Sequence, residues 1–287
     1  MGAGPLSGPA PDSAAGGEAE FSLLCFGEDV NAPRAVRLGA LELVWFASMG
    51  PEKGASEDAF FVRALPGDRV AAGVVDGMGG MVGGAAAARI GATRIHEALD
   101  GADGSGLRPA LVTGIERAHA EVLARVAGGG ATVAALSLSR EHCQFVHAGD
   151  AEGIHLSAAG QLRQRTVPHS PVGYAQASGV LTESEALAHP DRNLVASGLG
   201  VRGMTAQVGS REPLLHGDTV VLATDGLTDN VFEAEILAAL CDDGLEEGVA
   251  SLVELARARM KDPIPGPEGF TIGKPDDLTV LALRRGC

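Results

Sequence analysis

Cysteine is scarce in this sequence, and its placement excludes two classes of protein. The four cysteines lie far apart and form no CxxC pair; they are Cys25, Cys143, Cys241 and Cys287. This spacing argues against a zinc ribbon and supplies no disulfide framework, so a reducing cytosolic setting fits best. Long apolar runs are lacking too, because no stretch approaches the roughly 20 residues needed to span a bilayer.

Positive charge is the second shortage. Lys and Arg total 22 against 37 Asp and Glu, which gives a formal net charge of −15. A surface this acidic repels phosphate backbones and anionic lipids, so we expect neither nucleic acid nor a membrane as a partner. The sequence begins without the basic region and apolar core of a secretion signal, and Leu6 departs from the myristoylation pattern. We therefore expect a soluble, cytoplasmic protein, and a monomer.

The composition divides the chain into a tail and one domain. The first twenty residues are mostly Gly, Ala, Pro and Ser, and such a segment cannot bury enough apolar surface to offset the entropy lost on ordering. We expect residues 1–36 to form a disordered or loosely packed tail, in which residues 21–26 could form an outer strand. Residues 37–287 are predicted to form a single domain, since the chain is 45% hydrophobic and long enough for a sizeable core.

Short strands and long helices occur in blocks through this domain. The expected strands are 41–47, 58–64, 69–76, 131–138, 142–149, 151–157, 219–225 and 277–283, and the expected helices are 84–99, 107–126, 182–188, 232–242 and 246–260. Two groups of strands bracket two long helices, and further helices come late. This order predicts an α+β layered sandwich rather than a regular βαβ alternation.

Acidic residues recur at the ends of the predicted strands. They are Glu57, Asp58, Asp76, Asp150 (in a hairpin-like turn), Asp225, Asp229, Asp276 and Asp277. Strand ends can converge at one edge of a sheet, where clustered carboxylates repel one another unless cations neutralise them. Oxygen ligands without Cys or His partners favour Mg²⁺ or Mn²⁺ over zinc. Any one Asp beside Gly is more often part of a turn, so the prediction depends on the joint pattern.

Six motifs in chain order resemble the metal-dependent serine/threonine phosphatases of the PPM type (type 2C), especially the bacterial ones. They are SEDAFFV, VVDGMGG, GGGATVAALSL, VHAGDAEGIHL, LATDGLTDNV and PDDLTVLAL, within about residues 40–284. The stretch at 181–200 also resembles the mobile flap of that family. The resemblance implies a four-layer αββα sandwich, two antiparallel sheets flanked by helices, with a two-metal site at one edge.

The resemblance also implies which residues hold two Mg²⁺ or Mn²⁺ ions. Asp76 matches the carboxylate that bridges both ions, and the carbonyl of Gly77 matches a ligand that needs an uncrowded backbone. Asp225 and Asp276 match the carboxylates of one ion, and Glu57 matches the ligand of the other, partly through water. The three aspartates are therefore the implied catalytic residues.

Further roles follow from the same resemblance. Asp150 and Asp229 match residues that contribute to a third, weaker metal site in some members, and Asp58 would hydrogen-bond metal-bound water. Two bridged ions give a hydroxide near neutral pH, which attacks phosphorus in line with the serine or threonine oxygen and forms no phosphoenzyme. The implied substrates are phosphorylated proteins, and a partner serine/threonine kinase is typical of the family.

The loop before the first acidic motif departs from the family pattern. Lys53 stands where the phosphate-binding arginine is expected, and Ser56 stands where asparagine is usual. A lysine supplies charge to a phosphate but not the bidentate fork of arginine. Its other interpretation, a solvated loop lysine, is equally open from the sequence.

Four further departures concern histidine and the last acidic motif. Met78 and Met81 stand where some members carry histidine, and Pro168 precedes His169 where the family has aspartate. We assign His169 no catalytic role, because a single histidine in a proline-flanked loop is more often structural. Asp277 replaces the usual asparagine, and the added carboxylate would either strengthen metal binding or face solvent.

Two alternatives to an active phosphatase follow from these departures. The first is a catalytically weak or inactive regulatory binding module with the same fold. The second is a plain acidic protein that binds cations without recognising phosphate. The core carboxylates Asp76, Asp225 and Asp276 are all retained, which favours the enzyme.

Overall fold

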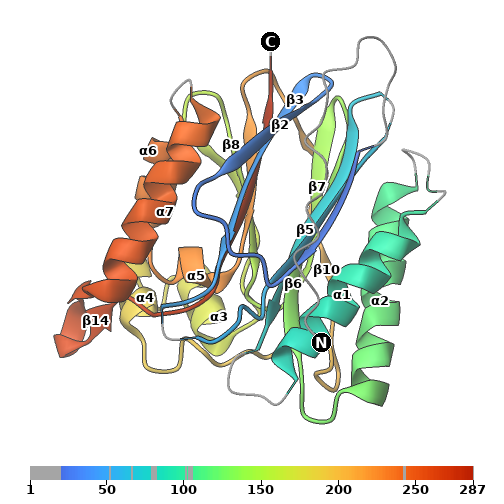
Figure 1. Cartoon of the computed structure of the whole chain (residues 1–287). Coiled ribbons are helices and arrows are strands. Elements are labelled where there is room, and N and C mark those ends of the chain that lie inside the picture. The colour runs from blue at the N-terminus through green and yellow to red at the C-terminus, as the bar shows by residue number, and fades with distance from the viewer. Residues whose placement is uncertain are drawn as a thin grey trace.

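Two antiparallel sheets lie face to face, and helices cover both of their outer surfaces (Figure 1). The computed structural model of the chain describes residues 21–51, 53–65, 67–78, 83–100, 102, 106–241 and 244–286. The layers follow one another as helices, sheet, sheet, helices, so the predicted αββα sandwich is confirmed. Within the described residues, no helix has both the length and the apolar character needed to cross a bilayer.

The first sheet has the strand order β1-β4-β5-β6-β7-β10, with β11 also paired to β7. Its strands are β1 (Ser22–Phe26), β4 (Ala59–Leu65), β5 (Arg69–Gly77), β6 (Ala131–Leu138), β7 (His142–Ala148), β10 (Gln207–Val208) and β11 (Glu212–Pro213). The central strands are almost wholly apolar because helices cover one face of the sheet and the second sheet covers the other.

The second sheet has the order β2-β3-β15-β12-β8-β9. Its strands are β2 (Arg34–Leu38), β3 (Leu41–Ser48), β15 (Leu278–Arg285), β12 (Thr219–Ala223), β8 (Glu152–Leu156) and β9 (Leu162–Arg165). The last strand of the chain therefore lies at the centre of the sheet, paired with β3 on one side and β12 on the other. A small separate hairpin consists of β13 (Ile264–Pro265), the 3₁₀ turn Pro267–Gly269 and β14 (Thr271–Ile272).

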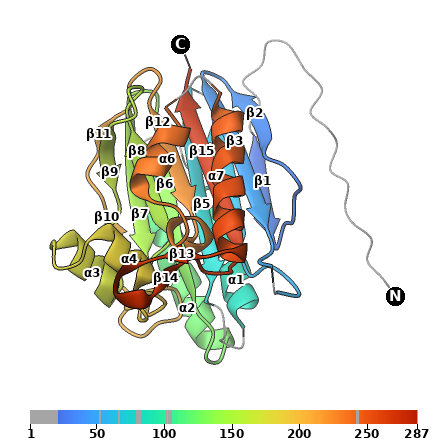
Figure 2. The same cartoon turned by 90° about the vertical axis from the view of Figure 1, so that its left-hand side faces the viewer.

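Helices of two kinds surround the sheets. Four cover the outer faces: α1 (Gly84–Ala98) and α2 (Leu107–Arg125) lie on the first sheet, and α6 (Glu233–Ala239) and α7 (Leu245–Lys261) on the second. Three short ones are α3 (Pro171–Ala177), α4 (Glu183–Ala188) and α5 (Asp225–Thr228), which lie near one another in Figure 1. Figure 2 shows α3 and α4 at one end of the sandwich. Apolar residues at helical spacing on α2, namely Leu111, Ile115, Ala118 and Val122, are fully buried against the first sheet.

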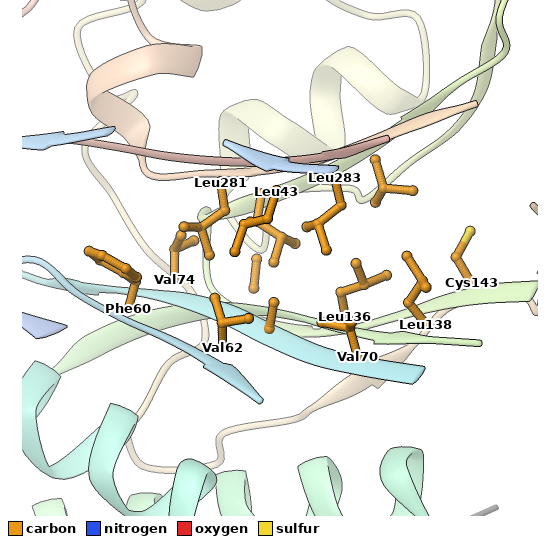
Figure 3. Packing of buried hydrophobic residues seen from close by; sticks show 14 of the residues in the cluster. Leu43, Phe60, Val62, Val70, Val74, Leu136, Leu138, Cys143, Leu281 and Leu283 are labelled. Carbon is orange, nitrogen blue, oxygen red and sulfur yellow. The ribbon is translucent and has the colours of Figure 1, made fainter. Parts of the chain in front are cut away.

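The main core lies between the two sheets. Side chains from β4, β5 and β6 of the first sheet meet those of β3 and β15 from the second, among them Phe60, Leu136, Leu43 and Leu281 (Figure 3). Two further apolar layers join each sheet to its own helices. This packing fixes the ends of the strands relative to one another, and those ends carry the acidic residues.

The N-terminal tail is shorter than expected, because strands β1 and β2 fall largely within residues 22–36 and belong to the two sheets. β1 pairs with β4 along its whole length, and β2 pairs with β3. Successive side chains of β1 point to opposite faces of the sheet, and both faces are covered, so this segment packs on two sides. Leu23 and Cys25 pack into the core between the sheets, whereas Leu24 and Phe26 pack towards the helices. Residues 1–20 lie outside the described residues, so the prediction for them stays a prediction.

Candidate functional site

The predicted acidic residues come from both sheets to the same edge of the sandwich. Asp76 lies near the end of β5, Asp225 is the first residue of α5 directly after β12, and Asp276 lies two residues before β15. Asp150 lies between β7 and β8, which belong to different sheets, so the expected hairpin-like turn carries the chain from one sheet to the other. The structure therefore brings these residues to one edge of the sandwich, close enough for their charges to interact, and their roles as metal ligands stay a prediction.

Burial and the charges of neighbouring carboxylates perturb the pKa of Asp76. The pKa of Asp76 is raised well above its usual range, first by burial and then by the charges of Asp225, Asp58, Asp276 and Asp150. Part of its surface reaches solvent, yet enough protein surrounds it for desolvation to be the largest cause. A cation bound among these groups would favour their ionised forms, which is the electrostatic property expected of a metal site.

Three neighbouring carboxyl groups share this perturbation. Burial and nearby aspartates raise the pKa of Asp58 and of Asp150 to about 8 each. Burial raises the pKa of Asp229 to about 7, although the nearby Lys274 ammonium opposes the rise. At neutral pH and without a bound cation, this edge therefore holds carboxyl groups that are partly protonated.

Asp58 is anchored from behind by two threonines. The hydroxyls of Thr224 and Thr279 donate to its Oδ2 at 3.0 and 2.7 Å. Its Oδ1 is buried and has no hydrogen-bond partner. A buried oxygen without a donor is unusual in a folded protein and fits a residue that hydrogen-bonds a water at the site. The expected hydrogen bond from Asp58 to a metal-bound water stays a prediction that this arrangement supports.

Asp277 holds the loop that precedes β4. Its Oδ1 accepts the backbone N–H of Gly50 and its Oδ2 accepts that of Glu57, both at 2.8 Å. The side chain is almost completely buried, with 2% of its surface exposed. Asp277 therefore does not face solvent, and its backbone contacts place Glu57 and Lys53 at the edge of the site. An asparagine has only one side-chain oxygen to accept these two N–H groups.

Lys53 is not a solvated loop lysine. Its Nζ lies 2.6 Å from Asp276 Oδ1 and 3.0 Å from Asp277 Oδ2. Burial acts to lower the pKa of Lys53, but the hydrogen bonds and charges of the two aspartates outweigh that effect and raise it. The structure thus places a permanent positive charge beside Asp276, as a phosphate-binding residue requires.

Sequence reasoning missed a second lysine at the same place. Lys274 Nζ forms an ion pair with Asp225 Oδ2, and it lies 3.0 Å from Asp276 Oδ2 and 3.4 Å from Asp229 Oδ2. Burial acts to lower its pKa, but the three carboxylates raise it. The available signal was its position two residues before Asp276. Because Lys53 and Lys274 flank Asp276 on its two oxygens, its pKa is lowered despite burial.

Glu57 and Gly77 meet where β5 approaches the start of α1. Glu57 Oε1 accepts the backbone N–H of Ala85 at 3.3 Å. A Cβ on Gly77 would lie 2.6 Å from the carbonyl of Gly84 and 2.8 Å from the carbonyl of Glu57, so no larger residue fits. This steric reason for glycine is independent of the expected carbonyl–metal contact, which stays a prediction. Met81 lies outside the described residues.

Met78, a departure from the family pattern, and His169, which follows the departure at Pro168, both have structural roles. Met78 turns towards Gly198 and Gly130, where a Cβ would lie within 2.6 and 3.1 Å of its side chain. His169 accepts the backbone N–H of Gly149 on Nδ1 at 3.3 Å, so its Nε2 carries the proton and donates to Gln207 at 3.1 Å. His169 therefore supports the turn before Asp150, consistent with the absence of a catalytic assignment.

A cleft connects the acidic edge with the segment that resembles a flap. Its lining includes Asp150, Asp225 and Asp229 on one side and residues of α3, α4 and the following loop on the other. Arg165 pairs with Glu152 and Glu233 within the cleft, at 2.6 and 3.1 Å. A substrate that entered the acidic edge from this direction would therefore contact the short helices.

The donor set fits hard divalent cations, although the carboxylates do not form a closed ligand set. In the described part of the chain, no three Asp, Glu, His or Cys side chains converge as a preformed metal site. Lys274 lies among them instead. Asp225 Oδ1 is buried without a hydrogen-bond partner, and the surrounding oxygens are the type that Mg²⁺ and Mn²⁺ prefer.

Comparisons with known sequences point to one family. The family model described as protein phosphatase 2C matches residues 52–255. The serine/threonine protein phosphatase PstP of Mycobacterium tuberculosis is 30% identical over 238 residues, which are 79% of this chain and 43% of PstP. The serine/threonine phosphatase stp of Listeria monocytogenes is 29% identical over 158 residues, which are 55% of this chain and 58% of that protein. The chain thus spans about half the length of these curated relatives.

Solved structures show the same architecture. The crystal structure of the Mycobacterium tuberculosis serine/threonine phosphatase PstP/Ppp has a TM-score of 0.67 and 26% identity, and the match covers 86% of this chain and 99% of that chain. The catalytic domain of PstP in complex with two manganese ions has a TM-score of 0.69 and 24% identity, with the same coverage. At this identity, the second match establishes the shared fold.

Proposed function

Because the chain belongs to the protein phosphatase 2C family, we propose that it is a metal-dependent phosphatase that hydrolyses phosphoserine and phosphothreonine in proteins. The observation that carries the proposal is the meeting of Asp76, Asp225 and Asp276 from both sheets at one edge, where burial and then the charges of neighbouring aspartates raise the pKa of Asp76. The proposal extends to this chain the activity named for relatives that it matches over part of their length.

The ligands for divalent cations would be Asp76, Asp225, Asp276, Glu57 and the Gly77 carbonyl. Two Mg²⁺ or Mn²⁺ ions at this edge supply a water of lowered pKa and positive charge for the phosphoryl oxygens. Asp150 and Asp229 would contribute to a third site. The PstP catalytic domain, which shares this fold, was solved with two manganese ions.

The chain's own residues then act on the water and on the phosphate. Asp58 Oδ1, buried and without a partner, accepts a hydrogen bond from the attacking water and orients it. Lys53 offers its ammonium to a phosphoryl oxygen beside Asp276. A lysine makes a point contact rather than a bidentate one, so phosphate orientation depends more on the rest of the site.

The wider biology is proposed from the family alone. Phosphorylated proteins are the substrate class, and a serine/threonine kinase is the expected opposing enzyme. We propose a cytoplasmic monomer, folded as one domain from about residue 22 onwards. The alternative, a weak or inactive regulatory module of the same fold, is favoured by one observation: lysine ammonium groups pair with Asp225 and Asp276, two of the proposed ligands.

Hydrolysis of a phosphothreonine peptide tests the proposal against this alternative. We expect turnover with Mn²⁺, none with EDTA, and a loss of activity in Asp76→Asn. Turnover that survives EDTA or the substitution would overturn metal-dependent catalysis. Folded wild-type protein that binds Mn²⁺ and hydrolyses no phosphopeptide would support the regulatory module instead.

A further inference from the structure

Lys274 lies where the proposed metal ligands gather. Its ammonium contacts one oxygen on each of three aspartates: Oδ2 of Asp225, of Asp276 at 3.0 Å and of Asp229 at 3.4 Å. The lysine side chain is mostly enclosed, with 17% of its surface exposed. A divalent cation that uses these oxygens would therefore meet a positive charge already in place.

The backbone of Lys274 is clamped to the same turn that carries two of these aspartates. Asn230, fully buried directly after α5, accepts the Lys274 N–H at 2.8 Å and donates to the Lys274 carbonyl at 3.0 Å. The same Asn230 amide donates to the Gly226 carbonyl at 2.9 Å, inside α5. The Asn230 carbonyl in turn accepts from Arg259 at 2.8 Å. The lysine is thus anchored at its base, and only its side chain is free to move.

Neither lysine contacts the other half of the proposed site. Among the described residues, Lys53 and Lys274 pair with Asp276, Asp277, Asp225 and Asp229, and no ion pair joins them to Asp76 or Glu57. Positive charge is therefore concentrated on the Asp225–Asp276 side. Two unit charges a few ångströms apart interact strongly at a protein surface, so a cation arriving on that side is opposed more than one at Glu57.

We propose that Lys274 is a tethered counter-ion that competes with a divalent cation for Asp225, Asp229 and Asp276. It neutralises the carboxylates when no metal is bound, and its side chain leaves when the cation arrives. The two cation sites are consequently unequal, with tighter binding beside Glu57 and Asp76 and weaker binding beside Asp225. The inference rests on the proposed function only in that these carboxylates are taken as metal ligands.

Manganese titration of the full chain tests the competition without any activity assay. Free Mn²⁺ is measured by electron paramagnetic resonance for wild type, Lys274→Met, Lys274→Arg and Lys261→Met. Lys261 is a matched control, because it is an exposed lysine in the last turn of α7. Lys274→Met should tighten the weaker binding step at least about tenfold. Lys274→Arg and Lys261→Met should bind as wild type does. Unchanged or weaker binding by folded Lys274→Met overturns the proposal.

Stability of the metal-free protein provides a second readout. In EDTA, Lys274→Met should melt at a lower temperature than wild type, because the carboxylates lose their counter-ion. The difference should shrink at saturating Mn²⁺. A purely structural lysine would lower the melting temperature equally in both conditions, which would contradict the proposal.

A measurement on the wild-type protein keeps the proposal testable if Lys274→Met does not fold. The chain has few lysines, and acetylation of each is quantified by mass spectrometry with and without Mn²⁺. Acetylation of Lys274 should rise severalfold with Mn²⁺, while Lys261 stays constant as the internal reference. Equal acetylation of Lys274 in both conditions contradicts displacement.

Failure of this inference and failure of the proposed function give different results. If Mn²⁺ binds more tightly to Lys274→Met but no variant hydrolyses a phosphopeptide, the competition stands and the phosphatase proposal fails. If wild type hydrolyses the peptide but Lys274→Met binds Mn²⁺ as wild type does, the phosphatase proposal stands and the competition fails.

Discussion

Strand β12 carries an aspartate near each of its ends, and the two behave differently. Asp218, directly before the strand, accepts the N–H of Ala158 on Oδ1 at 3.2 Å and that of Leu215 on Oδ2 at 2.9 Å. His155 also contacts its Oδ2, at 3.2 Å. Asp225, just after the strand, has a buried Oδ1 with no partner and an Oδ2 held by Lys274. In sequence the two look alike, since one follows a glycine and the other precedes one.

The difference separates a structural carboxylate from one that we propose as a metal ligand. At Asp218 both oxygens are satisfied by groups that the fold supplies, so the residue holds a turn together. At Asp225 the fold leaves an oxygen without a donor and brings other carboxylates near, which costs stability unless a cation binds. An oxygen without a donor, together with neighbouring carboxylates, distinguishes Asp225 from Asp218, whereas residue type does not.

Substitution of Asp225 should have the largest effect on activity. Asp225→Asn removes the charge of a proposed metal ligand, so we expect turnover of a phosphothreonine peptide with Mn²⁺ to fall at least about a hundredfold. Circular dichroism should show a folded protein. Activity within a fewfold of wild type would place Asp225 outside the catalytic site, and the proposed functional difference between Asp225 and Asp218 would be wrong.

The same substitution at the other end of β12 should affect stability instead. In Asp218→Asn, a single side-chain oxygen is left to accept hydrogen bonds that both carboxylate oxygens accept in the wild type. The free energy of unfolding in urea should therefore fall by about 2 kcal/mol. Turnover by the folded fraction should match wild type. A selective loss of activity without loss of stability would show that Asp218 also serves the site.

High pH should destabilise the metal-free protein, because several carboxyl groups at the acidic edge have raised pKa values. Asp58 and Asp150 have pKa values raised to about 8, and Asp229 to about 7, so the folded state binds more protons than the unfolded state between about pH 4 and 8. Stability in EDTA should therefore decrease as the pH rises from 5 to 9. Thermal melts at saturating Mn²⁺ should lose this slope, and a slope unchanged by Mn²⁺ would argue against cation binding at these groups.

Asp277 offers the smallest test, because it resembles Asp218 yet lies beside the site. Asp277→Asn should lose one of the contacts to Gly50, Glu57 or Lys53, at a cost of about 1 kcal/mol in the free energy of unfolding. Since the loop carrying Lys53 is loosened, KM for the phosphopeptide should rise more than kcat falls. An effect on kcat alone would assign Asp277 to the chemistry instead.

Much of the fold was predictable because its signals are local. Helical spacing placed α1 and α2 within a residue or two of their observed ends, and apolar runs bounded by glycine and aspartate located β5, β6 and β12. Local pattern indicated an outer strand at residues 21–26 but gave no signal for β2, and it could not show that the two strands pair with β4 and β3. Nor could it show that the turn at Asp150 links two sheets, since a short turn after one strand has the same composition in either case.

The candidate site was likewise predictable only in part from local sequence patterns. The recurrence of acidic residues at the ends of predicted strands indicated Asp76, Asp225 and Asp276. In the structure, the charges of Asp225 and Asp276 lie close enough to Asp76 to affect its pKa. Lys274 was missed because its one signal, a position two residues before Asp276, fits a solvated loop lysine equally well. Its position depends on Asn230, which reaches it only after the loop before β15 has packed against α5.

The sequence by itself determined the family, the layered architecture and the position of acidic residues at the strand ends, because periodicity, glycine placement and motif order are properties of the chain. Only the tertiary structure decided which aspartates are satisfied and which are not. Hydrogen-bond satisfaction depends on donors that are distant in sequence, such as Thr279 for Asp58 and Ala158 for Asp218. The packing of two sheets brings these donors to some carboxylates and leaves others with an oxygen for a ligand.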